Sequence, residues 1–203
     1  MNSNNHVKIE VADPSALGLL GLAIVTLVAS ANKLGIVNGV SLVIPWAIFL
    51  GAFVQLIACF NDIKHGNVFG TTAFGGYAFF WFGMGMSWMI QLGVFGEGMK
   101  VSADPKAFAF VFLGYLIFTI YMTIGAIETN KTLLIIFLLI DLLFLGLTLS
   151  SFGIAYHTTH TLAGIAEFLI ALASFYGSAA NVLNKTFNRE FLPLGKPLGI
   201  FKK

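Results

Sequence analysis

Charged side chains are scarce in this chain of 203 residues. Aspartate, glutamate, lysine and arginine together form 10% of it, whereas about 25% is usual in soluble domains. Hydrophobic residues form 58%, and phenylalanine alone accounts for 21 residues. This composition is typical of a protein whose surface is solvated by lipid, because lipid tails are as apolar as the side chains that meet them.

Cysteine pairs, clustered basic residues and long polar segments are also missing. The single cysteine, Cys59, excludes a disulfide within the chain. The lysines and arginines are scattered and form no basic stripe, so we expect no nucleic acid among the partners. The longest polar connection, Gly96–Pro105, is too short to bury a core of its own. The sequence therefore predicts one transmembrane domain over residues 1–203.

Six long apolar stretches fill the chain instead. Each has about the 18–25 residues that a helix needs to cross roughly 30 Å of hydrocarbon. The strands of a membrane barrel would alternate over segments of about ten residues, and runs such as Leu133–Ile140 do not alternate. We predict an all-α, polytopic membrane protein with six transmembrane helices, which excludes a soluble enzyme with a membrane tail. The predicted spans are Leu17–Leu34, Val40–Asn61, Thr71–Phe95, Lys106–Ile127, Thr132–Gly153 and Thr161–Leu183.

The distribution of basic residues predicts that both termini are cytoplasmic. An amino-terminal segment 1–15 and a tail 185–203 would then flank a six-helix bundle, 16–184, and eight of the eleven lysines and arginines would be cytoplasmic. An excess of such residues in cytoplasmic segments is the usual bias of membrane proteins. The eight are Lys8, Lys64, Lys131, Lys185, Arg189, Lys196, Lys202 and Lys203, and the other three are Lys33, Lys100 and Lys106.

Two acids lie at membrane depth, where ionisable groups are costly. Asp141 is about ten residues into the fifth predicted span, and Glu167 is about a turn and a half into the sixth. We predict that no lysine or arginine lies at membrane depth as a partner. Two interpretations stay open for each acid: a group that takes up protons, or a neutral acid bonded across a helix or oligomer interface.

Two histidines, His157 and His160, have the spacing of a metal pair. They lie at the end of a predicted span among threonines, with no cysteine or third histidine nearby. A zinc site usually takes three or four protein ligands. We therefore interpret both histidines as part of an interfacial loop, and we predict no metal and no cofactor.

A block in the third span carries a family resemblance. Gly66–Phe74 followed by Tyr77 and Phe80-Trp81 resembles the acetate uptake transporter family, whose members carry G-N-x-F-G-x-T-A-F and then Y-x-x-F-W. That family includes the bacterial succinate–acetate permeases and the fungal ammonia/acetate exporters. The segment Asp13–Leu19 matches the family's N-P-A-P-L-G-L signature in part, with Asp13 in place of asparagine. The resemblance extends from Asp13 to Gly195.

The resemblance implies a carrier or channel for acetate and related short carboxylates, including succinate, in the cell membrane. It also implies a ring-shaped homohexamer with one path through each protomer. In such members an aromatic on the first helix, a tyrosine on the third and a leucine on the fifth form a hydrophobic constriction. The matching residues here are Leu22, Tyr77 and Ile140, so the tyrosine alone is retained.

The polar residues of the spans fit such a path. Gln55 belongs to the family's second-helix G-x-x-x-Q, and we expect Gln55, Asn67 and Thr72 to replace part of the hydration of an anion. A threonine can instead bond back to its own helix. Asp13 either caps the first helix or faces the mouth of the path, and the cap is the favoured interpretation.

The sequence thus favours transmembrane transport of acetate and similar carboxylates by a multi-pass protein of the cell membrane. Transport is either coupled to protons, with Asp141 first and Glu167 second as the coupling group, or a passive flux of anions. An intramembrane enzyme that pairs these two acids would also need a histidine or nucleophile at matching depth, and we predict no enzymatic activity. An oligomeric scaffold is the third alternative.

Overall fold

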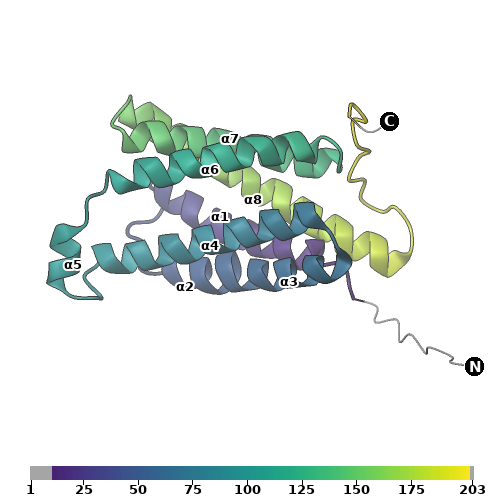
Figure 1. Ribbon diagram of the computed structural model, residues 1–203, viewed down its shortest axis with the longest axis horizontal. Helices are drawn as coiled ribbons and strands as arrows, with labels where there is room; N and C mark the ends of the chain where they lie inside the picture. The colour runs from purple at the N-terminus through teal and green to yellow at the C-terminus, as the bar shows by residue number, and fades with distance from the viewer. Residues whose placement is uncertain (1–10, 202–203) are drawn as a thin grey trace, which may run out of the picture.

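A computed structural model describes residues 11–201, and this part of the chain is helical with no strand (Figure 1). Residues 1–10 and 202–203, with Lys8 and the last two lysines of the predicted cytoplasmic set, lie outside the described residues. The helices are α1 Ser15–Lys33, α2 Ile44–Trp46, η1 Ala47–Val54, α3 Gln55–His65, α4 Val68–Gln91, α5 Glu97–Ser102, α6 Ala107–Ala126, α7 Lys131–Ser151 and α8 Tyr156–Phe187.

Helix length and composition agree with a membrane protein. Five segments are long and apolar enough to cross a membrane: α1, the continuous run Ile44–His65, α6, α7 and α8. α4 has 24 residues, so it is also long enough to span the hydrocarbon region. The prediction of an all-α polytopic membrane protein is confirmed.

The second span is not a regular α-helix. Pro45 lies in its first turn, where the missing N–H costs nothing, and the next eight residues, Ala47–Val54, form a π-helical segment. Such segments are rare and occur often at functional sites. α3 then begins at Gln55.

Two of the predicted boundaries that were wrong affect candidate functional residues. The second span continues past Asn61 to His65, because Gly66 adopts the left-handed conformation that ends α3. The last helix begins at Tyr156, so His157 and His160 lie in its first turns and not in a loop. Among the described residues no three acids, histidines or cysteines are placed to hold a metal ion.

The helices run in alternating directions, with α1 packed between α8 and the η1–α3 part of the second span. α6 and α7 lie together on one side of the bundle and α4 lies with the second span on the other (Figure 1). The described ends of the chain meet at one end of this bundle, which we call the terminal end. There the His65 ring nitrogen lies 3.2 Å from the Ala12 carbonyl, and the Thr132 N–H donates to the Leu194 carbonyl.

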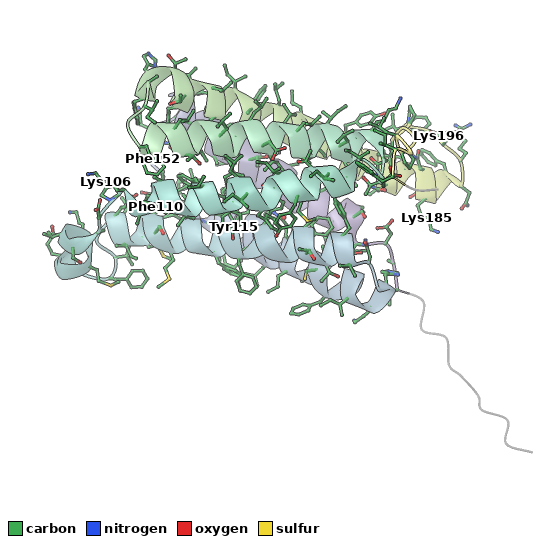
Figure 2. All side chains as sticks on the ribbon, turned by 45° about the horizontal axis from the view of Figure 1, so that its top comes forward. Lys106, Phe110, Tyr115, Phe152, Lys185 and Lys196 are labelled. Atoms are coloured by element: carbon green, nitrogen blue, oxygen red, sulfur yellow. The ribbon has the colours of Figure 1, made fainter. Side chains whose placement is uncertain are left out.

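The carboxyl-terminal segment packs across the terminal end. Tyr176 donates its hydroxyl hydrogen to the Pro193 carbonyl at 2.7 Å, and Leu198 N–H donates to the carbonyl of Ile127. Lys185 and Lys196 lie at this end, whereas Lys106 lies at the opposite, distal end (Figure 2). Which of the two ends is cytoplasmic stays a prediction.

Candidate functional site

A narrow cavity runs inside the bundle between α1, α3, α4 and α7. Its volume is about 60 Å³, and we call it the inner cavity. Most of its wall is apolar. The polar side chains in the wall are Ser15, Gln55, Asp62 and Asn67.

A second, wider cavity opens at the terminal end and is called the outer cavity. It has a volume of about 230 Å³ and includes Asp13 and His65 in its lining. Ser15, Asp62 and Asn67 line both the outer and the inner cavity. These three residues therefore form a neck between them.

A third, very small cavity of about 10 Å³ lies beyond the inner one. Leu22, Tyr77 and Ile140 line both of these cavities, and each is buried, with exposed fractions of 7%, 4% and 3%. The structure thus brings together the three residues that the sequence comparison placed at a constriction. They come from α1, α4 and α7, and they separate two cavities that lie in line.

The ring of Tyr77 is held by a hydrogen-bond chain to α6. Its hydroxyl lies 2.9 Å from the Thr119 hydroxyl, which donates in turn to the Tyr115 carbonyl at 2.8 Å. Because a carbonyl can only accept, the Thr119 hydrogen is committed to Tyr115 and Tyr77 must be the donor to Thr119. The hydroxyl is thereby anchored on α6 while the ring borders both cavities.

Gln55 is the first residue after the π-helical segment and points into the inner cavity. It is 1% exposed, and its amide nitrogen has no hydrogen-bond partner among the described residues. A buried amide N–H without a partner is costly, which makes it a ready donor for a ligand.

Asp62 was missed because the predicted second span stopped at Asn61. The carboxyl group is 2% exposed and accepts a hydrogen bond from the Asn67 amide at 2.9 Å. Asn67 also caps α4 by accepting from Gly70 N–H at 3.1 Å. A helical signal could have found Asp62, since it follows Gln55 by seven residues and so shares its face.

Of the other two residues predicted for the path, Asp13 lines a cavity and Thr72 does not. The Asp13 carboxylate accepts the N–H of Ser15, the first residue of α1, at 2.8 Å, and it also lines the outer cavity. The N-cap residue of α1 is Pro14, so Asp13 lies one position before the cap and satisfies a free N–H of the first turn from there. Thr72 is exposed on the outer surface of α4 and lines none of the three cavities, so the structure does not bring it to the other polar residues.

The two acids at membrane depth lie outside these cavities. The hydroxyl of Thr123 on α6 donates to Asp141 at 2.7 Å, so this acid faces α6 rather than the interior. Glu167 is 1% exposed and forms an ion pair with Lys33 at 2.9 Å. The prediction that no basic partner is available was wrong, because Lys33 is the last residue of α1 and its long stem reaches back toward α8.

Comparison with known proteins agrees with the fold and the sequence pattern. The profile of the GPR1/FUN34/yaaH family matches residues 2–194. An uncharacterised protein of Methanothermobacter thermautotrophicus is 31% identical over 188 residues, covering 91% of each chain. The Escherichia coli succinate–acetate/proton symporter SatP is 28% identical over 189 residues, covering 92% of this chain and 97% of that one.

One further relative and one solved structure extend this likeness. Acetate permease A of Emericella nidulans is 26% identical over 200 residues, covering 90% of this chain and 65% of its own length. The structure of the bacterial acetate channel SatP superposes with a TM-score of 0.85 at 24% identity, covering 92% of this chain and all of that one. This likeness concerns the fold.

We predict that Thr119→Val destabilises the protein more than Tyr77→Phe does. The valine leaves the buried Tyr77 hydroxyl without an acceptor, at a cost of about 1–3 kcal/mol. Tyr77→Phe leaves Thr119 bonded to the Tyr115 carbonyl, so its cost should be smaller. Thermal unfolding of the purified variants in detergent tests this order, and the double variant should resemble Tyr77→Phe. Equal costs for the two single variants would contradict the donor assignment.

We predict that Lys33→Met lowers the stability of the protein much more than Glu167→Gln does. Removing the lysine leaves a buried carboxylate without its partner, which typically costs about 3–5 kcal/mol. The neutral glutamine needs no counter-charge, but it leaves the lysine without an acidic partner. The double variant should recover much of the stability that either single change loses. Unfolding midpoints in a double-mutant cycle measure this coupling. Additive losses would show that the two groups act independently.

Proposed function

The chain belongs to the GPR1/FUN34/yaaH family, and from this premise we propose that it transports acetate and related short carboxylates, including succinate, across the cell membrane. Its relatives include a succinate–acetate/proton symporter and an acetate permease. The observation that carries the proposal is the line of cavities inside the bundle, interrupted at Leu22, Tyr77 and Ile140.

In this proposal an anion enters through the outer cavity and passes the neck. α4 begins beside the neck, and the amino end of a helix attracts anions through its free N–H groups and its dipole. Asn67 fixes that helix end by its capping bond to Gly70. The neck therefore supplies an electrostatic reason for a carboxylate to enter a mostly apolar interior.

Gln55 would be the first direct donor inside the inner cavity. Its unpartnered amide nitrogen can donate to a carboxylate oxygen and so replace part of the hydration that the anion loses. The methyl group of acetate suits the apolar part of the wall. Together these contacts favour a small organic acid over a fully hydrated inorganic ion.

The constriction would then limit leakage. Leu22 and Ile140 are aliphatic and Tyr77 has its hydroxyl engaged on α6, so the surface between the two cavities offers no free polar group of these three residues. Apolar constrictions resist ion flow by excluding water. A passing carboxylate must displace these side chains or be carried through when they separate.

The remaining assignments follow from the same proposal. Both termini would be cytoplasmic, the chain would assemble as a homohexamer with one path in each protomer, and no enzymatic activity is proposed. Asp141 and Glu167 bond to Thr123 and Lys33 on different helices, which argues against a paired-acid active site. Neither acid lines the cavities, and proton coupling through either of them stays a prediction.

A passive channel is the second functional candidate. The solved structure that this chain resembles is that of a channel, and the same line of cavities would serve it. The two modes differ in whether a proton gradient drives acetate against its own gradient. Accumulation of labelled acetate in proteoliposomes with an imposed pH gradient would support coupling, whereas equilibration alone would support a channel.

We predict that Gln55→Leu lowers the acetate flux by about tenfold or more, since the loss of one hydrogen bond to a charged group is worth about 1.5–3 kcal/mol. Labelled acetate uptake by reconstituted protein, corrected for protein-free vesicles, measures the effect. Gln55→Glu should lower flux at least as much, because it places a negative charge in the cavity. Thr72→Val is the matched control, and its flux should be unchanged. Unaltered flux in Gln55→Leu would remove this residue from the path.

A further inference from the structure

The neck contains a buried acid on the proposed route of an anion. Asp62 is 2% exposed and lines both the outer and the inner cavity. An ionised carboxylate at this place would repel a carboxylate substrate at close range, in surroundings where charges are poorly screened. A path for organic anions therefore needs a reason to keep an acid at its narrow entrance.

The two carboxyl oxygens of Asp62 differ in their hydrogen bonds. Oδ1 accepts from the Asn67 amide at 2.9 Å, whereas Oδ2 has no partner among the described residues. This asymmetry fits a carboxylic acid, with Oδ1 as the carbonyl oxygen and Oδ2 as the hydroxyl. A carboxylate would leave a buried, charged oxygen without a donor, which is far more costly.

Two unpartnered polar atoms line the same cavity from one face of α3. They are Oδ2 of Asp62 and the amide nitrogen of Gln55, on residues that lie seven positions apart. A protonated Oδ2 and the amide can each donate to a carboxylate oxygen. The pair therefore forms two successive donors along the proposed route.

Within residues 11–201 no permanently charged basic side chain lines the neck, so His65 and the amino end of α4 are the groups that favour the charged form of Asp62. The titratable groups that act on it are Asp13, which lies just before α1, and His65 on the same helix, and Asp62 acts in turn on Cys59, three residues earlier in α3. No lysine or arginine of the described residues lines the outer or the inner cavity. Lys185 of α8 lines an adjoining surface groove that shares Asp13 and His65 with the outer cavity.

We propose that Asp62 is a proton-operated gate at the neck, which rests on the transport function proposed above. The carboxylate form excludes anions from the inner cavity. When the carboxylate binds one proton from the water of the outer cavity, the neck becomes neutral and its new hydroxyl donates to the arriving substrate. The gate reopens to anions at low pH without any change in the constriction.

Gly70 explains why the acid can sit so close to α4. A Cβ atom at this position would collide with Oδ2 of Asp62 and would come within 2.6 Å of the Asn67 amide nitrogen. The glycine thus lets the acid reach the amino end of the helix. The position of the acid therefore depends on Asn67 and Gly70 as well as on Asp62 itself.

The test compares acetate flux in proteoliposomes for the unchanged protein and Asp62→Asn between pH 5 and 8. The asparagine resembles the protonated acid, so we expect similar fluxes at low pH. At high pH the variant should exceed the unchanged protein, and the ratio of the two fluxes should rise by up to about tenfold for each pH unit above the range in which Asp62 titrates. Because the ratio is taken at equal pH, the protonation of the substrate itself cancels.

Four further variants make the outcome specific. Asp62→Glu should keep the pH dependence of the flux. Asp141→Asn makes the same chemical change as Asp62→Asn, but outside the cavities, and it should also keep the pH dependence. His65→Gln tests the neighbouring group of the outer cavity. If Asp62→Asn does not reconstitute, Asp62→Ser supplies a second neutral neck with the same expected ratio.

A flux ratio that is constant with pH would overturn the gate and leave the transport function standing. Loss of the pH dependence in Asp141→Asn or His65→Gln, with Asp62→Asn unchanged, would also overturn it and would assign the proton to the other residue. Absence of acetate flux in the unchanged protein would instead contradict the proposed function.

Discussion

The satisfaction of polar groups inside hydrocarbon is the constraint on which this structure depends. A hydroxyl or carboxyl group away from water must find a partner within the bundle. Thr26 bonds back to the Leu22 carbonyl and Ser178 joins α8 to α1 through the Ala16 carbonyl. Lys33 and Glu167 neutralise each other between the same two helices. These bonds fix the helices around the cavities and leave few polar groups free.

The exceptions to this rule indicate the function. Among the described residues five buried side chains keep a polar atom without a partner, and two of them, Gln55 and Asp62, line the inner cavity. A protein that pairs most of its buried polar groups has a functional reason to leave a donor and an acid open in one place. The π-helical segment that precedes Gln55 belongs to the same region. A route for small carboxylates explains both observations.

The sequence predicted the number and character of the long helices because lipid imposes a simple length and polarity pattern. The prediction of the constriction came from the likeness of Tyr77 and its surroundings to a known family, since three residues on distant helices have no signal in spacing.

Asp62 was missed because a polar pair, Asn61 and Asp62, resembles the end of a span, whereas α3 continues to His65. The Lys33–Glu167 pair was missed because a lysine at a helix end can reach back along an apolar surface. Thr72 shares a motif with Asn67 but lies on the outer face of α4, and its position depends on helix phase, which the motif alone did not fix.

In the proposed mechanism carboxylates cross the bundle between Leu22, Tyr77 and Ile140. Labelled acetate flux through reconstituted Leu22→Ala, unchanged protein and Leu22→Phe tests it most directly, because the three side chains differ mainly in bulk. We expect the highest flux with alanine and the lowest with phenylalanine, with all three proteins equally folded. Equal flux in the three would contradict a route through this constriction.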